Sequence, residues 1–306
     1  MTLADYYDDW IMREKKSTVK DVTFAKYVQT GKWLRRISPD LEITELDKRS
    51  YQEIVNEYGK THERQTTKDF HTQLKACVTE AFEERILDRN PATRISIQGK
   101  QSLNKKPKFM SLEELGKLID TLDLSSLETM DWAILILAKT GLRFAECMAL
   151  TVQDFNFQDL TLTVNKTWNY KKGGGFSPTK NQSSIRVIEI DWQIAAQLQP
   201  LVEDMRPTDL VFVPTQNGIP KRIHNATYKS FLARKCKEAG VTEITLHGLR
   251  HTHGSVLLGQ GVSVLSVSKR LGHSNVTTTQ EVYLHITDEL ARKDRSLMMG
   301  ALAGIK

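Results

Sequence analysis

The chain has 306 residues, of which 40% are apolar, so it is long enough for two domains that each bury a core. Its longest apolar run, Trp132 to Ala138, is too short to cross a bilayer, and its acidic, aromatic N-terminus lacks the basic start of a secretion signal, so we expect a cytoplasmic protein with no membrane partner. The net charge of +6 and the pI near 9.0 are compatible with a polyanionic partner but do not establish one.

The first hundred residues predict helices and no strand. Apolar and aromatic residues recur at helical spacing over three stretches, 2–14, 22–37 and 65–87. Between them, Thr44 followed by Asp47 resembles an acidic variant of the capping box, at the start of a helix that ends at Gly59. We expect residues 1–98 to form one helical domain.

A basic segment without helical or strand periodicity follows. Its charged residues are all lysines: Lys100, Lys105, Lys106 and Lys108. This composition is typical of a linker, and we assign residues 99–108 to one. Two interpretations stay open, a solvated tether or a basic strap along a DNA backbone, where lysines displace counterions.

A second domain, over residues 109–306, is expected to mix helices with a few strands. It begins with a capping box, Ser111 to Glu114. Alternating residues predict two strands, over 160–164 and 185–190. A flexible basic turn region with Lys171, Lys172, three glycines and Lys180 separates them, and it lacks the Gly-Lys-Ser/Thr ending of a nucleotide-binding loop. Helices are expected over 111–121, 129–140, 222–239, 247–259, 263–271 and 277–285.

Six polar residues of the second domain form a chemically coherent set. They are Arg143, Lys180, His247, Arg250, His273 and Tyr283. A phenol that attacks a phosphodiester must be activated, the negative pentacovalent phosphorus must be stabilised, and the leaving oxygen must be protonated in a preorganised site. Two guanidiniums, an ammonium, two imidazoles and a phenol meet these needs, so we expect no metal and no cofactor.

The two arginines suit the charged transition state. A guanidinium stays charged and offers a planar fork to two phosphate oxygens, which lysine cannot do. Arg143 could instead form an ion pair with Glu146, three residues on, and the two interpretations can coexist. His247 and Arg250 share one face at the start of a predicted helix, where the helix dipole also favours a phosphate.

Other reactive residues of the chain are expected to be structural. His251 and His253 extend His247 to a metal-like pattern, but no carboxylate or cysteine accompanies them, so we expect packing roles. Tyr228 competes as a nucleophile but lacks any motif around it. The scattered cysteines offer neither a disulfide framework nor metal-ligand spacing; they are Cys77, Cys147 and Cys236.

The order and spacing of the motifs resemble a known family, the tyrosine recombinases, and among them the phage and transposon integrases. The segments that carry the resemblance are Thr140-Gly141-Leu142-Arg143, Leu246-His247-Gly248-Leu249-Arg250-His251 and Leu271-Gly272-His273, followed by Tyr283. The resemblance covers nearly the whole chain and is strongest from about residue 110 to 286. It implies a mainly α fold with a small antiparallel β-sheet, built from a helical, SAM-like core-binding domain and a mixed α+β catalytic domain.

The resemblance also implies a role for each polar residue. Tyr283 is the nucleophile that forms a 3′-phosphotyrosyl bond, which a 5′ hydroxyl of the partner duplex later attacks, without ATP. Lys180 is the general acid toward the 5′ oxygen, His247 acts in acid/base catalysis, and His273 joins the two arginines in stabilising the phosphate. The lysines that compete with Lys180 are Lys166, Lys171 and Lys172.

The implied partners are double-stranded DNA recombination sites and further copies of the chain, assembled as a tetramer on DNA. A tail over about residues 287–306 would join neighbouring copies, a directionality factor would be a further partner, and the protein would associate with the nucleoid. DNA contacts are expected from the linker and turn lysines, Lys100, Lys105, Lys106, Lys108, Lys171 and Lys172. Because the chain starts directly at the core-binding helices, we expect a truncated form or a recombinase without the arm-binding domain of many phage integrases.

Three alternatives stay open. A chromosome-dimer resolvase of the Xer type, or an invertase-like relative, would share the fold, although the basic turn with its glycines favours integrases. A type IB topoisomerase would relax DNA without strand exchange, but the domain size and the Leu-Gly-His motif favour recombinases. A DNA-binding repressor that has lost catalysis is disfavoured by the intact residue set.

Overall fold

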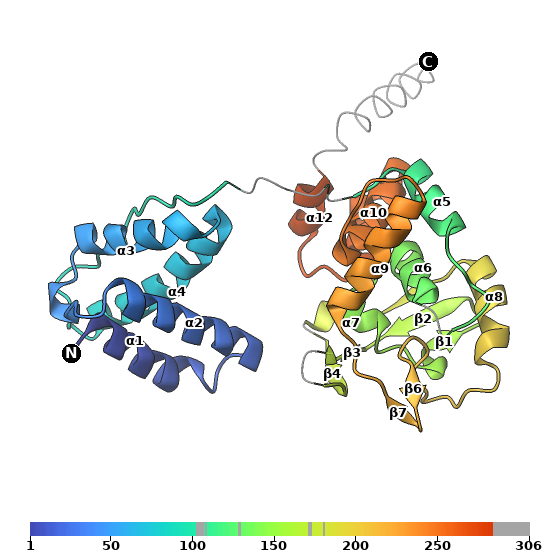
Figure 1. Ribbon diagram of the computed structural model, residues 1–306, viewed down its shortest axis with the longest axis horizontal. Coiled ribbons are helices and arrows are strands. Elements are labelled where there is room, and N and C mark those ends of the chain that lie inside the picture. The colour runs from blue at the N-terminus through green and yellow to red at the C-terminus, as the bar shows by residue number, and fades with distance from the viewer. Residues whose placement is uncertain (102–106, 108, 128–129, 171–172, 180, 284–306) are drawn as a thin grey trace, which may run out of the picture. The chain divides into compact units, whose positions relative to one another are not determined.

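The computed structural model describes residues 1–101, 107, 109–127, 130–170, 173–179 and 181–283, the side chains of 278 and 281–283 excepted. The chain divides into two compact units, Met1–Lys105 and Lys106–Lys306. Figure 1 shows helices in the first unit, and helices with short strands in the second. No helix among the described residues is long and apolar enough to span a membrane.

The N-terminal unit is helical, as predicted. Its described α-helices are α1 (Leu3–Trp10), α2 (Asp21–Ile37), α3 (Lys48–Thr61) and α4 (Arg64–Glu83). A π-helical turn, Ile11–Lys15, continues α1. Large aromatic side chains fill much of the core, among them Tyr7, Trp10, Tyr51 and Phe70. The aromatic stripes in the sequence therefore mark the buried faces of these helices.

The start of α3 differs from the prediction. Asp47 is the N-cap in place of Thr44: its carboxylate accepts a hydrogen bond from the backbone N–H of Ser50 at 2.8 Å. The Ser50 hydroxyl accepts in return from the backbone N–H of Asp47 at 3.0 Å. The cap lies further along the chain because a 3-10 turn, Ile43–Glu45, buries Ile43 directly upstream.

The end of α3 also differs, because Gly59 serves packing and does not end the helix. A Cβ at this position would lie 2.7 Å from the carbonyl oxygen of Gln98, so the glycine allows the chain to return along α3. The backbone N–H of Lys100 then donates to the carbonyl oxygen of His62 at 2.8 Å. The other predicted linker lysines, Lys105, Lys106 and Lys108, lie outside the described residues. The borders of the domains and the linker stay a prediction.

The C-terminal unit is organised around one buried helix. Its described helices are α5 (Leu112–Asp120), α6 (Asp131–Thr140), α7 (Phe144–Cys147), α8 (Trp192–Val202), α9 (Asn225–Glu238), α10 (Leu246–Gly259), α11 (Val264–Leu271) and α12 (Val276–Tyr283). Helix α6 is buried on nearly all sides and packs against α10. The capping box before α5 is confirmed, with Ser111 and Glu114 each accepting a hydrogen bond from the backbone N–H of the other.

Short antiparallel strands lie beside these helices (Figure 1). The three-stranded sheet has the order β1 (Phe155–Asn156), β2 (Thr161–Val164), β5 (Arg186–Glu189), with Val164 opposite Arg186. Two hairpins join β3 (Lys166–Trp168) to β4 (Phe176–Pro178) and β6 (Thr215–Gln216) to β7 (Ile219–Pro220). The predicted fold class, mainly helical with a small antiparallel sheet, is confirmed.

Candidate active site

The first arginine of the predicted set lies in the sharp turn between α6 and α7. Gly141 caps α6 in the left-handed conformation, with φ +68°, and a Cβ there would lie 2.7 Å from Cδ2 of His253. Glycine meets both demands without strain. Two residues later, Arg143 is the N-cap of α7, and its backbone N–H donates to Oε2 of Glu146 at 3.0 Å. The turn therefore fixes the backbone position from which the Arg143 side chain extends.

Three hydrogen bonds orient the Arg143 guanidinium. Its Nη1 donates to Oε1 of Glu146 at 2.6 Å and to Oγ of Ser184 at 3.2 Å, and its Nη2 donates to the carbonyl oxygen of Gly272 at 3.1 Å. The Glu146 side chain is 1% exposed, whereas Arg143 keeps 31% of its side chain exposed. The ion pair anticipated from the sequence is thus present, and it holds the arginine while leaving part of it open to solvent.

Helix α10 supplies the second arginine. The hydroxyl of Thr245 caps the helix, as expected for a threonine at this position. Arg250 is 1% exposed, its Nη1 donates to the carbonyl oxygen of Gly141 at 2.7 Å, and its Nη2 donates to that of Leu271. Arg250 therefore links the turn before α7 to the turn after α11, and it places a permanent positive charge beneath both.

Two histidines complete the described part of the cluster. His273 follows the glycine that ends α11, and its Nδ1 lies 2.8 Å from the buried Oγ1 of Thr279. Burial, together with the charges of Arg250 and Arg143, lowers the pKa of His273 to about 4. His247 keeps an exposed surface, but loss of hydration and the same two arginines lower its pKa as well. Both imidazoles are therefore neutral near pH 7 and share the surroundings of the two guanidiniums.

The side chains of the last two predicted residues lie outside the described part of the structure. Lys180 lies outside the described residues, two positions after β4, and Tyr283 is the last residue of α12, with its side chain outside them. Also outside are Lys171 and Lys172. The competing Lys166 binds the buried carboxylate of Asp154, with Nζ 2.6 Å from Oδ1. This ion pair argues against Lys166 as the proton donor.

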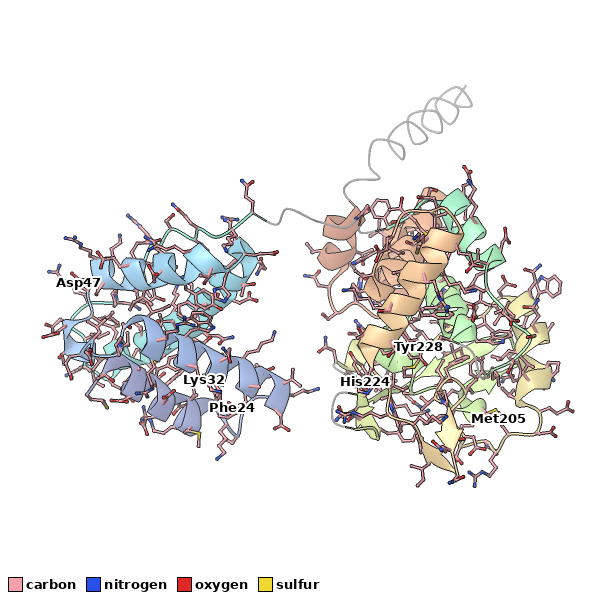
Figure 2. The ribbon with its side chains drawn as sticks, in the orientation of Figure 1. Phe24, Lys32, Asp47, Met205, His224 and Tyr228 are labelled. Carbon is pink, nitrogen blue, oxygen red and sulfur yellow. The ribbon has the colours of Figure 1, made fainter. Side chains whose placement is uncertain are left out.

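The other residues considered as competitors have structural contacts. Tyr228 lies on α9 (Figure 2), where its hydroxyl donates to a backbone carbonyl oxygen at 3.3 Å and burial raises its pKa. The rings of His247 and His251 meet edge to face, with centroids 4.5 Å apart. The buried ring of His253 accepts at Nε2 from Nε of Arg270 at 2.9 Å. The three cysteines are buried thiols that form no disulfide, and in the described part of the chain no His, Cys, Asp and Glu side chains are grouped to hold a metal.

One residue that sequence reasoning missed lies directly behind Arg143. Arg186, in β5, donates from Nη2 to Oε2 of Glu146 at 3.0 Å and from Nε to the carbonyl oxygen of Arg270 at 2.7 Å. The alternation of residues around Arg186 indicated a strand and nothing more. Its partners lie far away in the sequence, and local periodicity carries no signal for such contacts.

Comparison with known proteins agrees with this geometry. Residues 108–289 match the Phage integrase family. The tyrosine recombinase XerC of Bacillus subtilis (strain 168) is 28% identical over 245 residues, which cover 78% of this chain and 76% of the relative. The ICEBs1 integrase of the same strain is 27% identical over 282 residues, covering 85% of this chain and 74% of the relative.

A solved structure of the Tn1549 transposon integrase in complex with a circular intermediate DNA shares the fold. Its TM-score is 0.78 at 21% sequence identity, and the match covers 97% of this chain and 99% of that chain. The family match alone extends over more than half of the sequence. This chain therefore belongs to the phage integrase family, and it is a tyrosine recombinase, an enzyme that cuts and rejoins DNA.

Proposed function

We propose that this protein is a site-specific recombinase of the integrase type, which inserts a mobile element into DNA and excises it. Tyr283 attacks a phosphodiester, forms a 3′-phosphotyrosyl bond and releases a 5′ hydroxyl. A 5′ hydroxyl of the partner duplex then attacks that bond and frees the tyrosine. Each step exchanges one phosphoester bond for another, so the cycle consumes no ATP.

The observation that carries the proposal is the meeting of four side chains from three separate segments: Arg143, His247, Arg250 and His273. The two guanidiniums supply permanent charge for the pentacovalent phosphorus, in a site that hydrogen bonds to backbone carbonyls have already ordered. An arginine held in this way needs no reorganisation when negative charge develops, which favours the transition state over the ground state.

The neutral histidines suit hydrogen bonding and proton transfer. When the Thr279 hydroxyl donates to Nδ1 of His273, the ring hydrogen lies on Nε2, from which it can reach a non-bridging phosphate oxygen. A neutral His247 can accept the proton that the Tyr283 phenol must lose, because the ordinary pKa of a phenol is near 10. Lys180 then protonates the departing 5′ oxygen.

Double-stranded DNA is the proposed partner, and the DNA in the Tn1549 integrase complex supports it. Residues 1–98 form the core-binding domain in this proposal, residues 99–108 the linker and residues 109–306 the catalytic domain. Copies of the chain assemble as a tetramer on paired sites through the tail at 287–306. The net charge of +6 is consistent with a polyanionic partner.

A chromosome-dimer resolvase of the Xer type is the second candidate, because XerC is a relative at 28% identity. The ICEBs1 integrase is similar to the same degree, at 27% identity, and the basic turn with its three glycines, Lys171 to Gly175, favours the integrase. Recombination assays separate the two: an integrase joins DNA from the ends of the element that encodes it to a target, whereas a resolvase recombines a chromosomal site of the host.

The proposal is tested with a suicide substrate, nicked beside the cleavage position so that the short released strand diffuses away and religation fails. Incubation with DNA from the ends of the element should yield a protein–DNA adduct that survives denaturant and disappears on protease treatment. DNA that is bound but never becomes covalently attached would instead indicate a non-catalytic DNA-binding protein.

A further inference from the structure

A buried carboxylate is shared between two arginines behind the phosphate-facing side of the cluster. The Glu146 side chain is 1% exposed. Its Oε1 accepts from Nη1 of Arg143 at 2.6 Å, and its Oε2 accepts from Nη2 of Arg186 at 3.0 Å. Burial alone would raise the pKa of the Glu146 carboxyl, but the charges of Arg186 and Arg143 outweigh burial and hold that pKa below its usual value. Glu146 is therefore ionised, with one oxygen for each arginine side chain.

Arg186 is itself enclosed, with 7% of its side chain exposed. Besides Glu146 it binds two backbone carbonyl oxygens, donating from Nε to Arg270 at 2.7 Å and from Nη1 to Ser184 at 2.8 Å. These three bonds join β5 to α7 and to the last turn of α11. Arg186 has no room to reach a DNA phosphate while it holds these acceptors, so any effect on cleavage acts through its neighbours.

The turn that carries His273 rests on Arg186. Gly272 has φ +68°, and a Cβ there would lie 3.0 Å from Nη1 of Arg186 and 3.0 Å from the carbonyl oxygen of Ser183. The carbonyl oxygen of the same glycine accepts from Arg143. Arg186 thus contacts Glu146, which binds Arg143, and it lies against the turn that carries His273. Arg143 and His273 are both proposed to bind the phosphate.

The charges of the group explain why a third arginine matters. Arg143 paired with Glu146 alone would be a neutral unit, and a neutral unit attracts a phosphate weakly. With Arg186 added, two positive charges share one negative charge, so the group keeps a net positive charge beside Arg250. In a partly buried site, the attraction between this net positive charge and a phosphate is screened less than it would be at the surface.

We propose that Arg186 is a positioning residue for DNA cleavage: by binding one oxygen of Glu146, it leaves the group of Arg143, Glu146 and Arg186 with a net positive charge toward the scissile phosphate, and it supports the turn of His273. The proposal rests on the proposed function, since it assigns Arg186 a part in the same cleavage reaction. It predicts that the carboxylate becomes inhibitory once Arg186 is removed.

The test compares Arg186→Met, Glu146→Gln and the double variant in the full chain, by the rate of adduct formation on a suicide substrate at saturating DNA. Arg186→Met should lower this rate roughly tenfold to a hundredfold, less than the loss expected for a donor that touches the phosphate. The double variant should recover at least half of that loss on a logarithmic scale, because the uncharged amide that replaces the Glu146 carboxylate would no longer neutralise Arg143. DNA affinity should stay within about twofold, because Arg186 is enclosed.

Arg186→Lys is the matched control, since it keeps the charge and loses the fork of donors. Its rate should lie between those of the wild type and Arg186→Met. Circular dichroism verifies that each variant is folded, and Arg186→Gln replaces Arg186→Met if the latter unfolds. If the wild type is active but the double variant is no faster than Arg186→Met, the role of Arg186 is overturned and the proposed function is not. A wild type that forms no adduct would overturn the proposed function, and this proposal with it.

Discussion

Replacing His253 by glutamine should remove a specific pH dependence from the stability of the C-terminal unit. His253 is 7% exposed, its Nδ1–H donates to the carbonyl oxygen of Ala138 at 3.1 Å, and its Nε2 accepts from Nε of Arg270 at 2.9 Å. Both ring nitrogens are thus hydrogen-bonded, and a second proton, on Nε2, would face the N–H donor of Arg270. Burial first, and the charge of Arg270 second, lower the pKa of His253 to about 3.

The sign and size of the effect follow from this pKa. The unfolded chain binds a proton at an ordinary imidazole with pKa near 6.5, so between that pH and about 3 the unfolded state holds more protons than the folded state. The contribution of His253 to the free energy of unfolding is therefore fully present when the pH is above the pKa of the unfolded imidazole, and it is lost as the pH falls below that pKa. Between pH 7 and pH 5 the loss is about 2 kcal/mol of unfolding free energy.

Urea titrations at pH 7, 6 and 5 measure this loss, with hydrogen exchange of α10 peptides as the probe, so that the C-terminal unit is followed by itself. The wild type should lose about 2 kcal/mol more than His253→Gln between pH 7 and pH 5. His224→Gln is the control, because His224 is exposed at the start of α9, and it should behave as the wild type does. Equal pH dependence in the wild type and His253→Gln would refute the neutral, doubly bonded imidazole.

Further predictions concern the reaction and the turn of His273. Arg143→Ala should slow adduct formation about a hundredfold or more, near 3 kcal/mol, and Arg250→Lys should retain little activity; near-normal rates in single-turnover assays would contradict either role. Lys180→Ala should be rescued by a substrate with sulfur at the scissile 5′ position, because a thiolate leaves without protonation, whereas Arg143→Ala should not; equal defects on both substrates would assign the proton to another group. Gly272→Ala should destabilise the protein by roughly 1–2 kcal/mol, measured by urea unfolding, since a Cβ at φ +68° would also crowd Arg186 and Ser183; an unchanged midpoint would contradict that packing.

Short sequence motifs predicted correctly those helix ends that depend only on residues within the motif. The capping box of Ser111 and Glu114 is present as expected, because both partners lie within one turn. Thr44 was the wrong cap, because a buried turn upstream moves the helix start to Asp47, and tertiary burial is invisible to a four-residue motif. Helix α8 escaped prediction; it contains Pro200 and an exposed Trp192, which obscure an amphipathic pattern.

Within the site, too, local motifs explain some features and contacts between distant residues explain the others. The structure brings Arg143, His247, Arg250 and His273 near one another, and each of their motifs includes the glycine or cap that forms its turn. The burial of Arg250 beneath two backbone carbonyl oxygens, and the whole of the Arg186 network, depend on partners many residues away. No spacing in the sequence encodes those partners, since folding alone brings them together.

Adduct formation by the wild type and by Tyr283→Phe on one suicide substrate tests the central claim most directly. The phenol oxygen is the proposed nucleophile, and the ring without it can still pack. The wild type should trap DNA covalently, whereas Tyr283→Phe should bind the same DNA with similar affinity and trap none. A covalent adduct formed by Tyr283→Phe would show that another residue attacks the phosphate, and it would contradict the account.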